Sequence, residues 1–113
     1  MDRRRLVVID RDNMGEGSEE LGAKLMGSFL RKLCSPETRP EAMLFYNSGV
    51  KLLAEGSAVL DALETLEKHG VDLVACGTCA GYFGIRDSMV VGRISDMAEI
   101  VSRLLTSDSV VTV

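Results

Sequence analysis

The residues of this chain with the clearest chemical potential are the two cysteines of the segment Cys76-Gly77-Thr78-Cys79. Their spacing lets the two sulfurs approach each other or one metal ion. Three chemistries use such a pair, namely dithiol–disulfide exchange, persulfide transfer and zinc binding. Zinc usually takes two further ligands, and neither Cys34 nor His69 is expected near the pair, so we expect no metal. The remaining interpretation is that both cysteines are small buried hydrophobic residues.

The sequence around the pair predicts how the two thiols are positioned. The preceding segment Val71–Val74 is mostly bulky and apolar, as a strand covered on both faces requires. Gly77 then permits a sharp turn, and Thr78 is expected to cap a short helix that begins near Cys79. The thiols therefore fall at the carboxyl end of a strand and the amino terminus of a helix. That position favours negative charge, so a thiol there tends toward the thiolate.

The rest of the chain alternates between strand and helix patterns. Continuous apolar runs predict further strands at residues 6–9, 42–46, 89–91 and 110–113. Helices are expected to begin at serine caps, at Ser18, Ser57 and Ser95. Apolar residues at helical spacing predict the buried faces of the first and last helices, which are Leu21, Leu25, Met26, Phe29, Leu30 and Leu33, and Met97, Ile100, Val101, Leu104 and Leu105.

This alternation predicts an α/β domain with an open, mainly parallel five-stranded sheet and helices on both faces. The carboxyl ends of parallel strands share one edge of a sheet. The loops 10–17, 47–51 and 76–84 are therefore expected to converge there, and they hold most of the polar and glycine-rich sequence. We expect the functional site at this edge.

Several groups in these loops are candidates to stabilise an anionic sulfur. Lys51 is the cation of the second loop, although a solvated lysine explains it equally well. Backbone amides at the start of the first helix are able to bind a small anion, unless the loop before that helix is simply a tight turn. Tyr82 and Phe83 are expected to wall the cysteine pocket or to lie in a subunit interface. The candidate anion- or thiolate-stabilising residues are Lys51, Asn47, Ser48, Gly49, Gly15 and Gly17.

Length and composition limit the class of protein. The 113 residues form one domain, in which residues 1–5 are expected to be a solvated start or a linker remnant. A net charge of −4 argues against nucleic acid or an anionic membrane as the main partner. No apolar run approaches a transmembrane length, and the run after Arg5 is too short for a signal peptide.

Cysteine usage and size add two further expectations. Three cysteines with one close pair fit a reducing compartment, so a cytoplasmic location is expected. Cys34 is expected in the core, and His69 with Gly70 is expected to close a helix. A sheet of this size has few residues to cover two faces, so exposed apolar surface and self-association are expected.

A resemblance to a known family runs from about residue 6 to residue 113. The chain resembles the carboxyl-terminal domain of YedF-type selenium metabolism proteins, which looks like a member of the DsrE/DsrF-like superfamily. YedF-type proteins usually carry an amino-terminal TusA-like domain with a Cys-Pro motif, and this sequence has none. The motifs that carry the resemblance are Asp12–Gly17, Glu20–Gly22, Asn47–Leu52, Cys76–Cys79 and Tyr82–Gly84.

The resemblance implies a flavodoxin-like fold, assembly as trimers or hexamers, no cofactor, and a role as a sulfur or selenium carrier. Relatives such as the TusD and DsrE subunits pass a cysteine persulfide along a protein relay. Cys76 takes the place of their active cysteine and would accept the persulfide, while Cys79 would resolve or share it. The implied partners are a sulfur donor or acceptor protein, such as a TusA-like domain. Two other hypotheses stay open, a non-catalytic oligomeric binding module and a CxxC dithiol redox protein.

Overall fold

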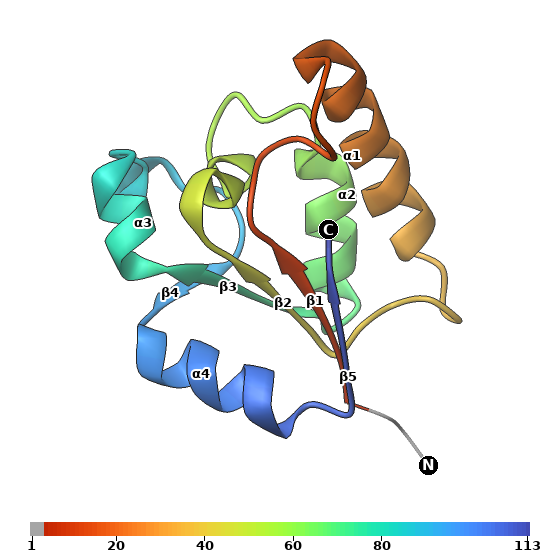
Figure 1. Ribbon diagram of the computed structural model, residues 1–113, viewed down its shortest axis with the longest axis vertical. Helices are drawn as coiled ribbons and strands as arrows, with labels where there is room; N and C mark the ends of the chain where they lie inside the picture. The colour runs from red at the N-terminus through yellow and green to blue at the C-terminus, as the bar shows by residue number, and fades with distance from the viewer. Residues whose placement is uncertain (1–3) are drawn as a thin grey trace.

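The sheet of this protein is entirely parallel, and it places every strand's carboxyl end at one edge. A computed structural model describes residues 4–113 (Figure 1). Five strands lie in the order β4-β3-β2-β1-β5. They are Arg5–Ile9 (β1), Ala42–Phe45 (β2), Asp72–Cys76 (β3), Arg93–Ser95 (β4) and Ser109–Thr112 (β5). The predicted α/β fold with a parallel five-stranded sheet is confirmed.

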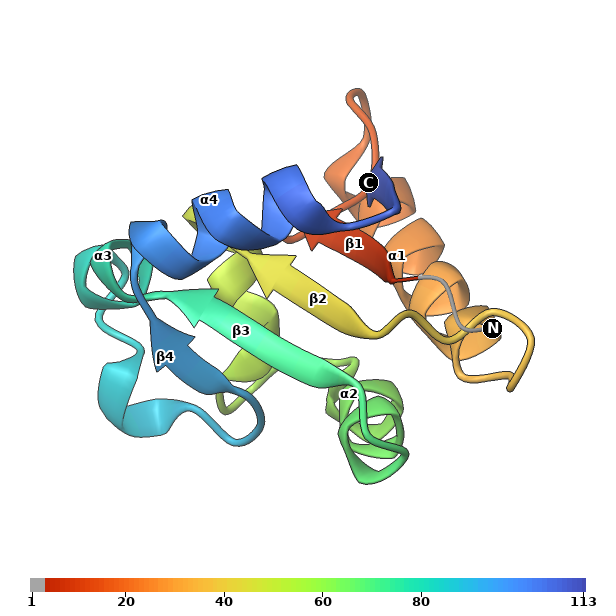
Figure 2. The ribbon, with the colours of Figure 1, turned by 90° about the horizontal axis from the view of Figure 1, so that it is seen from below.

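Helices cover both faces of the sheet, but unequally. Helices α1 (Glu19–Leu33) and α2 (Leu60–Lys68) lie on one face, and α4 (Met97–Thr106) lies on the other (Figure 2). The short helix α3 (Gly77–Tyr82) follows β3 directly, and two 3-10 helices occupy Asn47–Leu53 and Arg86–Ser88. The connection from β4 to β5 runs back across the sheet, so the direction of winding reverses after β4. Within the sheet this reversal falls between β1 and β5, so the loop that follows β1 lies at the place where open α/β sheets commonly bind ligands.

Two apolar clusters follow from the alternation of side chains along the strands. The larger cluster lies between the sheet and α1 and α2, and it includes Ile9, Met43, Phe45 and Leu63. The smaller cluster lies on the α4 side and consists of Leu6, Val8, Ala42, Leu44, Val74, Cys76 and Ile100. Cys76 is thus part of the wall between the sheet and α4.

The first helix begins where the sequence predicts, but part of its predicted buried face is wrong. Ser18 caps α1, accepting a hydrogen bond from the Leu21 backbone at 3.1 Å. Leu21 and Leu25 are nevertheless 54% and 45% exposed. Glycines replace them on the buried side. A Cβ on Gly22 would lie 2.9 Å from the Asn13 Cβ, so the loop after β1 packs directly on the helix backbone.

The fourth strand is also displaced from its prediction. Residues 89–91 do not enter the sheet, because Val90 and Val91 donate hydrogen bonds to the Leu53 carbonyl and Met89 forms an antiparallel bridge with Ala54. The chain turns at Gly92, which has a φ of 83°, and only then pairs with β3.

Three predicted helix caps are also wrong. Leu60 begins α2 instead of Ser57, with Val59 in the cap position. Asp96 caps α4, accepting from the Glu99 backbone, while Ser95 ends β4. Thr78 lies inside α3, because this helix begins at Gly77 and has Cys76 in the cap position.

The chain start is only partly described. Residues 1–3 of the predicted solvated start lie outside the described residues. Arg5 instead opens β1, and its guanidinium donates hydrogen bonds to the carbonyls of Glu37 and Arg39. No helix among residues 4–113 is long and apolar enough to span a membrane.

Helix α4 is held to the sheet by a small apolar contact and a network of ion pairs. Of its predicted buried face, Ile100 is buried and Leu104 is half-buried. Arg103 lies 2.6 Å from the Asp72 carboxylate at the start of β3, and Arg93 of β4 pairs with both Asp72 and Glu99. The apolar side chains of α4 and β5 that stay exposed are Met97, Val101, Leu105, Val110 and Val111. Self-association through them stays a prediction.

These ion pairs make the stability of the fold depend on acid. Hydrogen bonds from Arg93 and Ser95 lower the pKa of Glu99 from its ordinary 4.5 to about 2, and Arg93 likewise lowers the pKa of Asp72. The unfolded chain therefore binds more protons in this range, and stability is lost as the pH falls from about 4.5 toward 2. With the Glu99 side chain 26% exposed, we expect its share to be about 1 kcal/mol.

Denaturant unfolding at neutral and acidic pH checks this expectation. The pH-dependent loss of stability should shrink in Glu99→Gln, which cannot gain a proton. An undiminished loss in that variant would show that Glu99 does not contribute.

Candidate functional site

The two thiols of the Cys76–Cys79 pair lie in different environments. Cys76 ends β3 and is only 2% exposed, because the strand's alternation turns its side chain toward the α4-side cluster. Cys79 lies one turn later in α3, is half-buried, and packs against both apolar clusters. The pair thus has one thiol enclosed in the protein and one that reaches its surface.

The thiol of Cys79 is in contact with the segment that follows β2. The backbone N–H of Asn47 donates a hydrogen bond to the Cys79 Sγ at 3.0 Å. Asn47 has a left-handed φ of 50°, which non-glycine residues adopt rarely and asparagine more readily than most. The sequence predicts a polar loop at residues 47–51, but the segment is a 3-10 helix that buries Gly49, Val50, Leu52 and Leu53.

Burial raises the pKa of the Cys79 thiol above its ordinary value. The Asn47 N–H acts in the opposite direction by bonding to the sulfur, and the neighbouring Cys76 raises the pKa further. The thiolate expected at a helix amino terminus is therefore not the resting form near neutral pH.

An open pocket of about 540 Å³ surrounds Cys79, lined by Asn47, Thr78, Cys79, Tyr82 and Phe83. The rings of Tyr82 and Phe83 meet edge to face with centroids 5.1 Å apart. Tyr82 is 83% exposed and so stands at the rim. Both aromatic residues therefore line the cysteine pocket, in agreement with the first of their two predicted positions.

Lys51 is held beside this pocket rather than in it. Its ammonium lies 4.6 Å from the centroid of the Phe83 ring, a cation–π contact. Lys51 also lines a separate pocket of about 280 Å³ together with Asp12 and Val59. The structure thus connects Lys51 to the cysteine pocket through Phe83, and shows no contact between its ammonium and either thiol.

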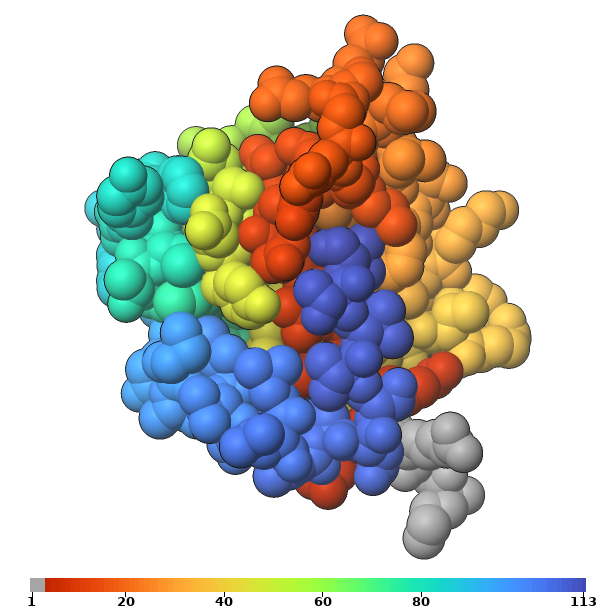
Figure 3. Space-filling model, viewed as in Figure 1, coloured from red at the N-terminus to blue at the C-terminus, as the bar shows by residue number. Residues whose placement is uncertain are grey.

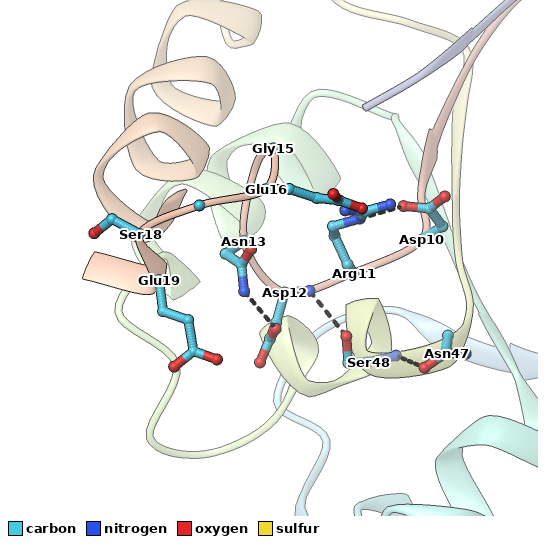
Figure 4. Close-up of a pocket in the computed structure, with 11 residues that line it drawn as sticks. Asp10, Arg11, Asp12, Asn13, Gly15, Glu16, Ser18, Glu19, Asn47 and Ser48 are labelled. Atoms are coloured by element: carbon cyan, nitrogen blue, oxygen red, sulfur yellow. Dashed lines mark hydrogen bonds and ion pairs between the residues drawn. The ribbon is translucent and has the colours of Figure 1, made fainter. Parts of the chain in front are cut away.

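The glycine-rich loop lines a different, polar pocket of about 450 Å³ (Figure 4). Gly15 and Gly17 have φ values of 79° and 125° and form a turn before α1. The charges of this pocket do not suit an anion, since its lining holds four carboxylates and one guanidinium, that of Arg11, which pairs with Asp10 at 3.3 Å. The four are Asp10, Asp12, Glu16 and Glu19.

Asn47 and Ser48 join this polar pocket to the cysteine pocket. The Ser48 hydroxyl accepts a hydrogen bond from the Asp12 backbone at 3.2 Å, and the Asn47 Oδ1 accepts one from the Ser48 backbone at 2.8 Å (Figure 4). In the space-filling view the loop after β1, the 3-10 helix and α3 lie in a row along one edge (Figure 3). The predicted convergence of the three loops is thus observed.

Gly49 has a structural role that the sequence alone does not reveal. A Cβ at this position would lie 2.3 Å from the Ile9 carbonyl oxygen at the end of β1. The 3-10 helix therefore packs directly onto the β1 backbone, and only glycine permits this approach. Its contribution to the site is to fix the segment that carries Asn47.

Arg86 is a residue of the site that sequence reasoning missed. Its Nη2 donates a hydrogen bond to the Gly77 carbonyl at 2.9 Å, between the two cysteines. A Cβ on Gly77 or Gly81 would lie 3.2 or 3.3 Å from the Arg86 side chain. Two glycines four positions apart in a short helix were the available signal, because such a face indicates close packing.

The other candidate ligands lie apart from the pair. Cys34 ends α1, where its thiol donates to the Leu30 carbonyl and burial raises its pKa. His69 follows α2 in the cap position and is exposed. Over residues 4–113, no group of three or more His, Cys, Asp or Glu side chains is arranged to hold a metal ion.

Comparison with known proteins now identifies the family. The sequence profile of the DsrE/DsrF-like family matches residues 15–113. The chain belongs to the DsrE/DsrF-like family. No curated protein matches it in sequence.

Solved structures of low sequence identity share the DsrE-like fold. The YchN protein of E. coli is 19% identical with a TM-score of 0.69, covering 99% of this chain and 100% of its own. The protein MTH1491 of Methanobacterium thermoautotrophicum, described as of unknown function, is 23% identical with a TM-score of 0.71 and the same coverage. BT1422 of Bacteroides thetaiotaomicron is 12% identical with a TM-score of 0.67, covering 97% and 95%.

The close approach at Gly49 predicts a large effect of one methyl group. Gly49→Ala should lower the free energy of unfolding by about 2 kcal/mol or more, because neither backbone can yield easily. Gly27→Ala is the matched control, since its Cβ would meet mainly the flexible end of Arg31 and alanine favours the helix. Denaturant unfolding of both variants measures the difference. Equal stability of the two would contradict the assigned contact.

The different burial of the two thiols predicts different reactivity. In the folded protein a small alkylating reagent should modify Cys79 at least about tenfold faster than Cys76, which must await local opening. Mass spectrometry of the peptide that contains both cysteines measures each rate. The difference should disappear in denaturant, and equal rates in the folded protein would show that Cys76 is accessible.

Proposed function

We propose that this protein is a sulfur or selenium carrier that holds a chalcogen atom as a persulfide (or its selenium analogue) on the Cys76–Cys79 pair. The observation that carries the proposal is the arrangement of the pair at the carboxyl edge of the sheet. Cys79 opens into a pocket of about 540 Å³, and a second thiol lies buried behind it. Membership of the DsrE/DsrF-like family and the likeness to YedF-type proteins support the same chemistry.

Within this proposal the first acceptor is Cys79 rather than Cys76. A protein donor cannot bring its persulfide to a side chain that is 2% exposed, whereas the Cys79 pocket is open to solvent. Cys76 is then the second thiol, which shares or resolves the persulfide. This assignment reverses the roles that the resemblance implies.

The exchange needs no oxidant, reductant or cofactor. The thiolate of Cys79 attacks the terminal sulfur of the donor's persulfide, and a new S–S bond forms as the donor's S–S bond breaks. The electron pair of the broken bond stays on the donor cysteine, which takes up the proton that Cys79 has lost. Delivery repeats these steps with an acceptor thiol as the nucleophile and Cys79 as the leaving group.

The pocket fits a protein donor better than a free small molecule. The exposed Tyr82 ring at the rim and the Phe83 wall offer apolar contact to a loop that carries a cysteine. A TusA-like domain is such a partner. Passing sulfur directly between two protein thiols also avoids its release.

Intact mass spectrometry after incubation with a cysteine desulfurase and cysteine tests the proposal. The wild type should gain the mass of one sulfur atom, and Cys34→Ala, the matched control, should gain it equally. Cys79→Ala should lose the adduct, while Cys76→Ala should still load, since its thiol is not the entry point.

The other outcomes separate the alternative functions. An adduct lost with Cys76 alone would return the acceptor role to that residue. A reversible Cys76–Cys79 disulfide without any sulfur adduct would indicate a dithiol redox protein. Three unmodified thiols in every sample would favour a non-catalytic binding module.

A further inference from the structure

We propose that Asn47 is a positioning residue, whose left-handed backbone aims a peptide N–H at the Cys79 sulfur and so sets the reactivity of that thiol. This inference rests on the proposed function for its purpose, because a carrier cysteine must be both nucleophile and leaving group. The role of Asn47 itself is argued from the geometry of the structure.

The geometry concerns one peptide group, the one between Tyr46 and Asn47. Its carbonyl accepts a hydrogen bond from the Gly49 N–H at 3.1 Å, and its N–H donates to the Cys79 Sγ at 3.0 Å. The C=O and N–H of a trans peptide point in opposite directions. Fixing the carbonyl inside the turn 46–49 therefore aims the N–H outward, at the sulfur.

Asn47 occupies the position of this turn that needs a positive φ. Tyr46 before it is extended, with φ −142° and ψ 172°, and Asn47 then turns the chain with a φ of 50°. Among residues 4–113 it is the only non-glycine residue with a positive φ. Its Oδ1 accepts from the Ser48 N–H at 2.8 Å, the kind of local bond by which asparagine supports turns.

The surrounding structure leaves this turn little freedom. The Tyr46 N–H donates to the Ile9 carbonyl at 3.2 Å, and Gly49 packs against the same carbonyl oxygen. Both ends of the turn are thus fixed to the end of β1. A residue that disfavours positive φ at position 47 must therefore rotate the peptide between them, which moves the N–H away from Cys79.

The chemical consequence lies in the charge on sulfur. Cys79 carries negative charge when it attacks a persulfide and again when it leaves after delivery. An N–H directed at the sulfur stabilises that charge in both steps. Burial disfavours the negative charge and raises the pKa of Cys79. The hydrogen bond from Asn47 lowers this pKa and so acts against burial.

Two variants separate the backbone conformation from the amide side chain. Asn47→Ala and Asn47→Gly both remove the Oδ1 bond, but only glycine adopts a positive φ without strain. The folded chain is alkylated across pH, and mass spectrometry of its cysteine-containing peptides then gives the rate of Cys79. Cys34 in the same samples is the internal control, and circular dichroism verifies the fold.

We expect Asn47→Ala to raise the apparent pKa of Cys79 and to slow its alkylation at neutral pH by about two- to tenfold, the usual net worth of one hydrogen bond. Asn47→Gly should stay within about twofold of the wild type, and Cys34 should be unchanged in both. If Asn47→Ala does not fold, Asn47→Ser makes the same comparison, because serine also disfavours positive φ.

An unchanged pH profile in Asn47→Ala would overturn the inference, and so would an equal loss in the alanine and glycine variants. The test does not depend on sulfur transfer. A protein that never accepts sulfur from a desulfurase but shows the expected profiles would refute the proposed function and retain the role of Asn47. Normal sulfur loading together with an unchanged pH profile in Asn47→Ala would support the proposed function and refute the role of Asn47.

Discussion

The parallel pairing of β1, β2 and β3 is the constraint on which the site depends. Because the three strands run in one direction and in register, the backbone ends of Ile9, Phe45 and Cys76 arrive at the same edge. The chain then needs only short connections to bring the β1 loop, the 3-10 helix and α3 together. Glycine at position 49 closes the remaining gap, since the helix backbone rests on the end of β1.

The positions of the two cysteines relative to the sheet explain why their exposure to solvent differs. A strand that is covered on both faces alternates its side chains between two cores, and the last residue of β3 falls on the α4 side. Cys79 follows after one helical turn and lies where both clusters end. Two residues of the same type thus acquire different access to solvent from their positions in the fold alone.

Sequence patterns predicted the parts of this structure that depend on local periodicity. The alternation of strands and helices along the chain, the Ser18 cap and the convergence of the loops follow from apolar runs and turn residues. The errors came from tertiary contacts. Residues 89–91 have the apolar pattern of a strand, yet Val90 and Val91 bond to the Leu53 carbonyl. Leu25 has helical spacing but is exposed, while Gly22 is buried against the loop after β1.

The site was predicted less completely than the fold, for a related reason. Residue type and spacing identified the Cys76–Cys79 pair, and parallel topology placed Asn47 near it. Burial decides which thiol is reachable, and a hydrogen bond from a backbone N–H carries no side-chain signature in a sequence. The contact of Arg86 with Gly77 was missed because it depends on the path of the chain after α3.

The enclosed position of Cys76 also bears on how the protein withstands oxidative damage. An oxidant reacts with a thiol only where it reaches the sulfur, and Cys76 is shielded between the sheet and α4. Cys79 opens into its pocket and is the thiol of the pair that an oxidant meets first. The fold therefore divides exposure to oxidants unequally between two cysteines of one short motif.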